Sequence, residues 1–119
     1  MAFMDIQPIT PGHLLVIPKA HAPRLLDVDP QDMARMMTVA QQLAQALRSS
    51  TVPAEGINLW LADGEVALQS VFHTHLHVIP RNTDDGFFIG GDFHDPGRPV
   101  LDGQADDIRR ALAPSPELP

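Results

Sequence analysis

Short apolar runs between chain breakers predict three β-strands in this sequence. The first, over residues 13–17, follows a Pro-Gly turn signal and stops at Pro18. The second covers 56–61, and the third covers 71–79 and stops at Pro80. Runs of this length with β-branched residues, bounded by Pro and Gly, are typical of buried strands. The chain is therefore expected to contain a sheet.

The spacing of apolar residues between the first and second strands predicts a helix over about 30–49. Asp29 can cap its start, Pro30 suits the first helical position, and Asp32 places negative charge at the positive end of the helix dipole. Apolar side chains then recur at helical spacing and form one stripe. We interpret this stripe as a core face: Met33, Met36, Met37, Ala40, Leu43, Ala44 and Leu47.

The order of strand, helix and further strands predicts an α+β domain, with an antiparallel sheet that carries one main helix on one face. Residues 1–113 are expected to form this single domain. Within it, 82–101 are expected to be mostly loop, and 106–112 a short helix. The tail, 114–119, contains three Pro residues and is expected to be disordered.

Length and charge narrow the functional classes. The chain has 119 residues, and its 8 basic and 15 acidic side chains give a net charge of −7 with neutral His. This charge argues against binding to nucleic acid or an anionic membrane, because both depend on clustered Lys and Arg. The absence of Cys excludes disulfides, a thiolate zinc site and a Cys nucleophile. No signal peptide or long apolar stretch is visible, so a cytoplasmic protein is expected.

Three of the six His residues lie within five positions of the third predicted strand: His73, His75 and His77. Successive side chains of a strand point to opposite faces, so the three imidazoles are expected to leave the same face. A neutral imidazole with one unprotonated nitrogen is a nucleophile, and its neighbours can fix its tautomer. A second His, charged near neutral pH, could donate to phosphate. The pattern indicates phosphoryl or nucleotidyl transfer through a phosphohistidine-like intermediate.

The same residue types also suit a metal ion. His is the commonest metal ligand, and His-x-His on a strand is a recurrent zinc arrangement. A further His13 or His94 could complete such a shell. The residue types alone leave the nucleophile and the metal site open, with a purely structural His cluster as a third interpretation.

The segment His73-Thr74-His75-Leu76-His77-Val78-Ile79 resembles the signature of the histidine-triad (HIT) superfamily. The flanking residues 69–72 and 80–81 are similar to the family, and so is the distant block 10–21. The third triad position is His77, as in the hydrolase branches of the superfamily. The resemblance covers residues 2 to about 85.

This resemblance implies a homodimer that acts on nucleotides at the α-phosphorus and requires no metal or other cofactor. His75 would be the nucleophile and would form a covalent nucleotidyl-imidazole. His77 would contact phosphate and position His75, while His73 and His13 would support the triad. The implied substrates are a dinucleoside polyphosphate or a nucleoside phosphoramidate.

The resemblance also implies the residues that bind substrate. Asp5 matches a position that holds the ribose hydroxyls, and a carboxylate is suited to accept two hydroxyl hydrogen bonds. Phe3 and Ile6 match apolar positions around the base. Ser70 matches a position that hydrogen-bonds the phosphate or leaving group, and Gln69 beside it is assigned to the same site. His21 and Trp60 receive no functional role and are read as a surface residue and a packing residue.

Three features depart from the family pattern. Ala62 stands where an Asn or Gln donor to the phosphate is usual, and Leu68 replaces a Gly that lets the backbone approach phosphate. Family members also usually carry a further N-terminal segment. These departures motivate a second hypothesis, a nucleotide-binding module with weak or no catalysis. A His-ligated zinc hydrolase is the third hypothesis.

Overall fold

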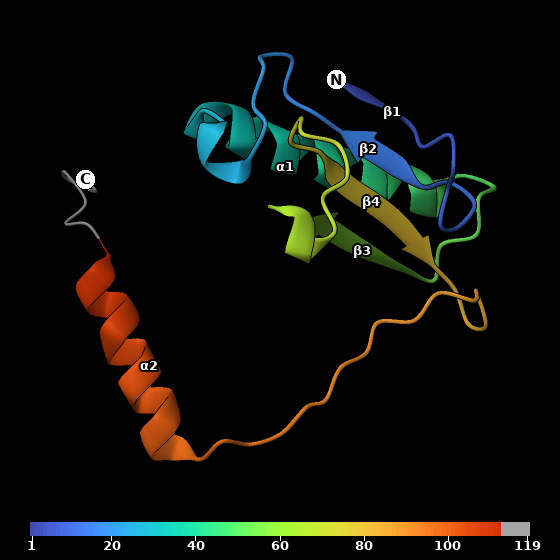
Figure 1. Cartoon of the computed structure of the whole chain (residues 1–119). Coiled ribbons are helices and arrows are strands. Elements are labelled where there is room, and N and C mark those ends of the chain that lie inside the picture. The colour runs from blue at the N-terminus through green and yellow to red at the C-terminus, as the bar shows by residue number, and fades with distance from the viewer. Residues whose placement is uncertain (113–119) are drawn as a thin grey trace. The chain divides into compact units, whose positions relative to one another are not determined.

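The computed structural model describes residues 1–112. The chain contains two compact units, Met1–Phe87 and a second that starts at Phe88 (Figure 1). The predicted tail, 114–119, lies outside the described residues, and the expected single domain over 1–113 stays a prediction. Among the described residues, no helix combines the length and apolar character that a membrane crossing needs.

The first unit is built on a four-stranded antiparallel sheet with the order β1-β2-β4-β3. The strands are β1 (Ala2–Met4), β2 (Leu14–Val16), β3 (Gly56–Leu61) and β4 (Leu76–Arg81). The predicted α+β class and antiparallel sheet are confirmed. The strand β1 is not predicted from the sequence, because its three residues form a strand only by pairing with β2.

The central strand β4 fixes the neighbours of His77. Across one side, His77 pairs with Leu15 of β2, and across the other it pairs with Trp60 of β3. Side chains opposite each other in antiparallel strands lie about 4.5–5.5 Å apart at their Cβ atoms. Residues from three distant parts of the chain therefore meet on one face of the sheet.

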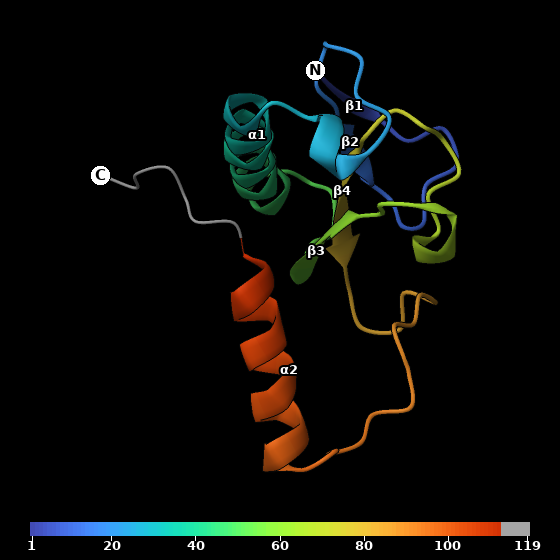
Figure 2. The same cartoon turned by 60° about the vertical axis from the view of Figure 1, so that its left-hand side comes forward.

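The helix α1 (Pro30–Ser49) has the predicted bounds and packs against β4 and β2 (Figure 2). Its cap is the predicted Asp29, whose carboxylate accepts from the backbone N–H of Gln31 at 2.8 Å. Three members of the apolar stripe are buried: Met36, Ala40 and Leu47. Met37 is an exception, since it is 49% exposed and does not belong to the core.

The core lies between this helix and one face of the sheet. Leu76 and Val78 of β4 are 4% and 0% exposed and belong to the same apolar cluster as the helix side chains. Because strand side chains alternate, His77 between them points to the opposite face. Burial of the apolar residues thus holds the imidazole on the open face of the sheet.

The strand predicted over 71–79 is wrong in its bounds. The strand β4 begins at Leu76, so His73 and His75 lie before it rather than within it. It also continues through Pro80 to Arg81. The expectation that one strand aligns all three imidazoles is therefore incorrect.

The segment before β4 is held by the loop that follows β2 instead of by a strand partner. The backbone N–H of Thr74 donates to the carbonyl of Ala22 at 2.6 Å. Nε2 of His73 bonds to the carbonyl of Pro18 at 2.9 Å. Because Pro18 has no backbone N–H, β2 cannot extend a regular ladder through this position.

Two short 3-10 helices, Leu25–Asp27 and Glu65–Ala67, complete the first unit. The second unit contains the helix α2 (Arg98–Ala111). The prediction of loop up to residue 101 and a short helix at 106–112 is wrong, because the helix begins at Arg98. Pro99 lies in its first turn, where its missing N–H has no helical partner to lose.

Candidate active site

The two ring nitrogens of His75 are in different states. Nδ1 lies 2.8 Å from the carbonyl oxygen of His73, and a carbonyl can only accept, so Nδ1 donates its proton. In the neutral imidazole the proton-free nitrogen is then Nε2, which carries a lone pair. The side chain is half-buried. His75 can therefore act as a nucleophile through Nε2.

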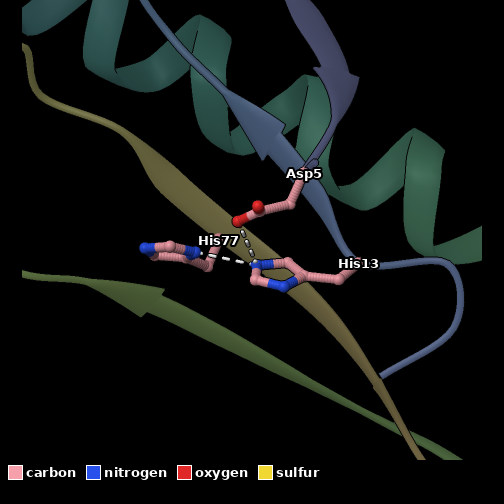
Figure 3. A group of neighbouring side chains, drawn as sticks. All are labelled: Asp5, His13 and His77. Carbon is pink, nitrogen blue, oxygen red and sulfur yellow. Dashed lines mark hydrogen bonds and ion pairs between the residues drawn. The ribbon is translucent and has the colours of Figure 1, made fainter. Parts of the chain in front are cut away.

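A chain of hydrogen bonds fixes the tautomer of His77. The backbone N–H of Ile9 donates to Nδ1 of His13 at 3.0 Å, so the proton of the neutral His13 ring is on Nε2. That nitrogen donates to Nδ1 of His77 at 2.8 Å (Figure 3). His77 must then carry its own proton on Nε2, where it is a hydrogen-bond donor.

Burial keeps this pair of rings neutral. It lowers the pKa of His77 from 6.5 to about 4, and the nearby His75 and His13 add to the effect. Burial also lowers the pKa of His13, while the Asp5 carboxylate opposes the shift. Near neutral pH, His77 is thus a neutral donor and not the charged second His that the sequence suggested.

Asp5 lies on the same side of the sheet as this pair. Its Oδ2 is 3.7 Å from Nε2 of His13, and both groups point toward each other in Figure 3. Its Oδ1 accepts from the backbone N–H of Gln7 at 2.8 Å. The carboxylate is close to the His13–His77 pair, and its binding of ribose stays a prediction.

The three side chains of Figure 3 are also the group best placed to hold a metal, since their ligand atoms all lie within 4.8 Å of one another. The His13 and His77 nitrogens, however, are only 2.8 Å apart. A tetrahedral zinc ion with bonds of 2.0–2.1 Å would hold ligand atoms about 3.3 Å apart. The arrangement of these residues fits a hydrogen bond and not a shared zinc ion.

Two recesses lie next to the triad. A recess of about 310 Å³ borders His75 and is lined by Phe3, Leu15, Ile17, Val71, His73 and His75. A recess of about 190 Å³ borders His77 and is lined by Ile9, Trp60, Leu68, His77, Ile79 and Phe87. The ring centroids of His75 and His77 are 4.8 Å apart. The predicted base contact Phe3 lies in the first recess, whereas Ile6 is 96% exposed and lines neither.

A nucleophilic imidazole, a neutral imidazole donor beside it and two flanking recesses occur together in the first unit. A protein-family model described as HIT domain matches residues 1–84. The chain belongs to the HIT family. Among solved structures, a member of the HIT family from Bacillus subtilis is similar, with a TM-score of 0.86 and 37% identity. The similarity covers 96% of this chain and 82% of that protein.

Two curated relatives of this HIT chain are named as nucleotide hydrolases. An adenosine 5'-monophosphoramidase from Saccharomyces cerevisiae is 38% identical over 90 residues, which are 75% of this chain and 54% of the relative. A bis(5'-nucleosyl)-tetraphosphatase (asymmetrical) from Schizosaccharomyces pombe is 38% identical over 84 residues, 71% of this chain and 46% of the relative. The chain thus spans about half the length of these two proteins.

Gln69 and Ser70, the two residues predicted to bind the phosphate or leaving group, differ in whether their side chains are accessible to a substrate. Gln69 is 2% exposed, and its side-chain oxygen accepts from the N–H of Gly64 at 2.8 Å. Its amide nitrogen donates to the carbonyls of Pro23 and Val71. The Gln69 side chain therefore holds the surrounding loops and is not free to bind substrate, contrary to the prediction. Ser70 is exposed on the segment that leads to His73.

Ala62 and Leu68, two of the three departures from the HIT pattern, have different structural consequences. Ala62 is 4% exposed and has no donor to offer. Leu68 has a φ of 72°, which is in the left-handed region that favours glycine, and its side chain is 74% exposed. The chain thus keeps the backbone conformation of a Gly position but adds an isobutyl group to it.

Several residues of this HIT site are not predicted from the sequence. Trp60, interpreted as packing, lines the smaller recess, and Ile9 and Phe87 line it with no earlier assignment. The alternation of β3 could have placed Trp60 on one face, but only the pairing with β4 puts that face beside His77. His21 is exposed as expected, with its ring 6.0 Å from that of His73. His94 is exposed in the second unit.

Proposed function

We propose that this chain is a nucleotide hydrolase that cleaves at the α-phosphorus through a covalent nucleotidyl-His75 intermediate. The observation that carries the proposal is the bond from Nδ1 of His75 to the His73 carbonyl, which leaves Nε2 free to attack. The neutral donor at Nε2 of His77 supplies a hydrogen bond to a phosphate oxygen, where negative charge grows during attack.

The proposed reaction has two steps. In the first, Nε2 of His75 forms a bond to phosphorus, and the bond from phosphorus to the leaving group breaks. The leaving group takes the electron pair of that bond and one proton from the surrounding water. In the second step, the oxygen of a water molecule bonds to phosphorus, its protons pass to solvent, and the electron pair of the broken P–N bond returns to His75. The products are a nucleoside monophosphate and the free leaving group.

The substrate class rests on the relatives and the recesses. One named relative is an adenosine 5'-monophosphoramidase and the other a dinucleoside tetraphosphatase. Both names fit a nucleoside monophosphate joined to a leaving group through phosphorus. The larger recess contains Phe3 and borders His75, so it supports the placement of the nucleoside there.

Mass spectrometry tests this proposal directly. The intact protein is mixed briefly with an adenosine 5'-phosphoramidate and quenched, and an added adenylyl group is expected on the peptide that contains His75. The variant His75→Asn should fold, accept no adenylyl group and release no AMP. His94→Asn is the matched control, because His94 is exposed in the second unit. Full turnover by His75→Asn would refute the nucleophile assignment.

A nucleotide-binding module with little catalysis is the second candidate. Ala62 favours it, because removal of one donor that acts on the transition state typically costs about 10²–10³ in rate. Calorimetry with AMP beside a turnover assay separates the two candidates. Binding of AMP with no product over hours would favour the module.

We further propose that the chain forms a homodimer through β3 and α1. The strand β3 is at an edge of the sheet and offers unpaired backbone groups. Beside it runs an apolar groove whose lining includes Met37, Ile57 and Leu59. Met37 and Leu59 are 49% and 43% exposed. Sedimentation should show a dimer that Leu59→Lys dissociates, whereas Leu26→Lys, at an exposed position that does not line this groove, should leave it intact.

A further inference from the structure

We propose that Gln69 is a positioning residue, whose buried amide clamps the loop after β2 to the segment that carries His73 and His75 and so keeps the proton of His75 on Nδ1. We call residues 70–75 the triad segment. The inference deepens the proposed function and rests on it for its effect on turnover. The tautomer itself is a property of the folded chain and can be measured without a substrate.

The hydrogen bonds of the Gln69 amide allow one orientation of its oxygen and nitrogen. Oε1 lies 2.8 Å from the backbone nitrogen of Gly64, which can only donate. Nε2 lies 2.6 Å from the carbonyl oxygen of Pro23 and 3.1 Å from that of Val71, which can only accept. A flipped amide would place its oxygen against two acceptors and its nitrogen against a donor. Both amide hydrogens are therefore used, and the side chain is 2% exposed.

The amide nitrogen of Gln69 joins two parts of the chain that are distant in sequence. Pro23 belongs to the loop after β2, 46 positions before Gln69, and Val71 belongs to the triad segment. On the other side of the amide, Oε1 holds Gly64 at the start of the turn that precedes the triad segment. The backbone N–H of Gln69 donates to the carbonyl of the same Gly64 at 3.0 Å. The amide is thus a buried junction of three segments.

The triad segment depends on such a clamp because it lies outside the sheet, before the first residue of β4. Near its end, the backbone N–H of Thr74 donates to the Ala22 carbonyl at 2.6 Å. Near its start, the Val71 carbonyl accepts from the Gln69 amide, which also bonds to Pro23. Ala22 and Pro23 are consecutive, so both anchors lead to the same place in the loop after β2. The path of the segment is set by its register with this loop.

The path of the triad segment in turn decides the tautomer of His75. Nδ1 of His75 donates to the carbonyl oxygen of His73, two residues earlier in the same segment, at 2.8 Å. This bond requires a backbone that turns the carbonyl toward the ring. The ring of His73 is itself held by the loop, through Nε2 and the Pro18 carbonyl at 2.9 Å. Loss of the Gln69 clamp releases the start of the segment, and the His75 ring can then adopt either tautomer.

The clamp needs an amide. The side chain of Gln accepts on one atom and donates two hydrogens from the other. In Gln69→Glu the shape is kept, but an ionised carboxylate has no proton to offer the carbonyls of Pro23 and Val71. In Gln69→Met the length is similar, and all three side-chain bonds are lost. The two variants therefore remove the same donors in different ways.

The first test measures the tautomer of His75 by nuclear magnetic resonance, which distinguishes a protonated from an unprotonated ring nitrogen. At about pH 8, wild-type protein should carry the proton on Nδ1 alone, whereas Gln69→Met and Gln69→Glu should show both tautomers. Gln42→Glu is the matched control, because Gln42 is exposed on α1 and lines neither recess beside the triad. It should keep the wild-type pattern. A wild-type pattern in both Gln69 variants would overturn the clamp while the proposed hydrolase stands.

The second test uses acid to restore the clamp in Gln69→Glu. Burial raises the pKa of the introduced carboxyl group above its ordinary range, and its protonated form can again donate to one of the two carbonyls. With an adenosine phosphoramidate as substrate, kcat of Gln69→Glu should be about 10–100-fold below wild type near pH 8. The ratio of the two kcat values should rise as the pH falls toward 6. The charged groups on the neighbouring segments titrate in both proteins, so their effects cancel in this ratio: Arg24, Asp63, Glu65 and His73.

Gln69→Met separates this rescue from a general effect of acid, since its kcat relative to wild type should stay low throughout. A constant ratio for Gln69→Glu would overturn the clamp, because loss of packing alone does not respond to protonation. If Gln69→Met does not fold, as judged by circular dichroism, the pH dependence of Gln69→Glu decides. A wild-type protein that hydrolyses no adenosine phosphoramidate would instead overturn the proposed function, and the tautomer measurement would then decide the clamp by itself.

Discussion

Nε2 of His13 lies 2.8 Å from Nδ1 of His77 and donates a hydrogen bond to it. The direction of this bond is set by the backbone N–H of Ile9, which occupies the other nitrogen of His13. A main-chain group thus determines which nitrogen of His77 faces the solvent with a proton. His13 itself is 1% exposed, so we propose that it positions His77 and does not touch substrate.

Loss of this positioning bond should lower turnover. In His13→Ala, His77 can adopt either tautomer, and kcat should fall about 10–100-fold, as is typical when a partner that orients a functional His is removed. His13→Gln keeps an amide donor near the position of Nε2 and should recover part of the rate. Steady-state kinetics on an adenosine phosphoramidate measure both effects, with circular dichroism to verify folding. Equal losses in kcat for the two variants would argue against the positioning role.

The depressed pKa of His77 predicts a loss of stability in mild acid. The pKa is about 4 in the folded chain and 6.5 ordinarily, so between these values the unfolded chain binds more protons. As far as His77 is concerned, the free energy of unfolding is highest above pH 6.5, where the ring is neutral in both states. It decreases as the pH falls toward 4. The urea midpoint of wild-type protein should therefore drop more between neutral pH and pH 5 than that of His77→Gln. Parallel curves for the two proteins would contradict the prediction.

Thr74 predicts a stabilising substitution. Its side chain is 1% exposed, and its hydroxyl has no hydrogen-bond partner within residues 1–112. Val has the same shape without the hydroxyl, so Thr74→Val should raise the free energy of unfolding by about 1 kcal/mol. Thr10 is the matched control, since its buried hydroxyl donates to the Pro80 carbonyl at 2.7 Å. Thr10→Val should lower the free energy of unfolding by about 1–3 kcal/mol, and urea titration of both variants tests the contrast.

Leu68→Gly should also stabilise the fold. A left-handed conformation costs a non-glycine residue about 1–2 kcal/mol, and glycine removes this cost. Glycine also loses more backbone entropy on folding, which destabilises the folded chain by about 0.5–1 kcal/mol. The expected net gain in the free energy of unfolding is therefore up to about 1.5 kcal/mol. Leu68→Ala keeps a Cβ atom and should show no such gain. Thermal unfolding of the two variants decides whether backbone strain is present.

Treatment with a chelator distinguishes the proposed metal-independent hydrolase from the His-ligated zinc hydrolase. The His13–His77 distance of 2.8 Å suits a hydrogen bond, so we predict that treatment with EDTA leaves phosphoramidate turnover unchanged. Loss of activity that zinc restores would favour the zinc hydrolase instead. Metal analysis of the protein before and after treatment is the control for incomplete removal.

The sequence by itself determined two local elements and the pattern of burial around His77. The helix over 30–49 follows from its cap and apolar spacing, and the strand over 56–61 from its apolar run, and both have the predicted bounds. Leu76 and Val78 are buried as their alternation with His77 predicts. These features depend on residues close together in the chain, so local periodicity is sufficient to predict them.

Only the tertiary structure decided how the His residues meet. His73 and His75 lie outside the strand because their segment bonds to the loop after β2. The His73 ring bonds to the Pro18 carbonyl, and the backbone N–H of Thr74 donates to the Ala22 carbonyl. His13 reaches His77 from 64 positions away, and Trp60 faces His77 only through the register of β3 on β4. Likewise, the side-chain amide of Gln69 is hydrogen-bonded to the backbone of Gly64, Pro23 and Val71. No sequence pattern specifies these bonds. These contacts depend on pairing and burial between distant segments, and a one-dimensional pattern does not contain that information.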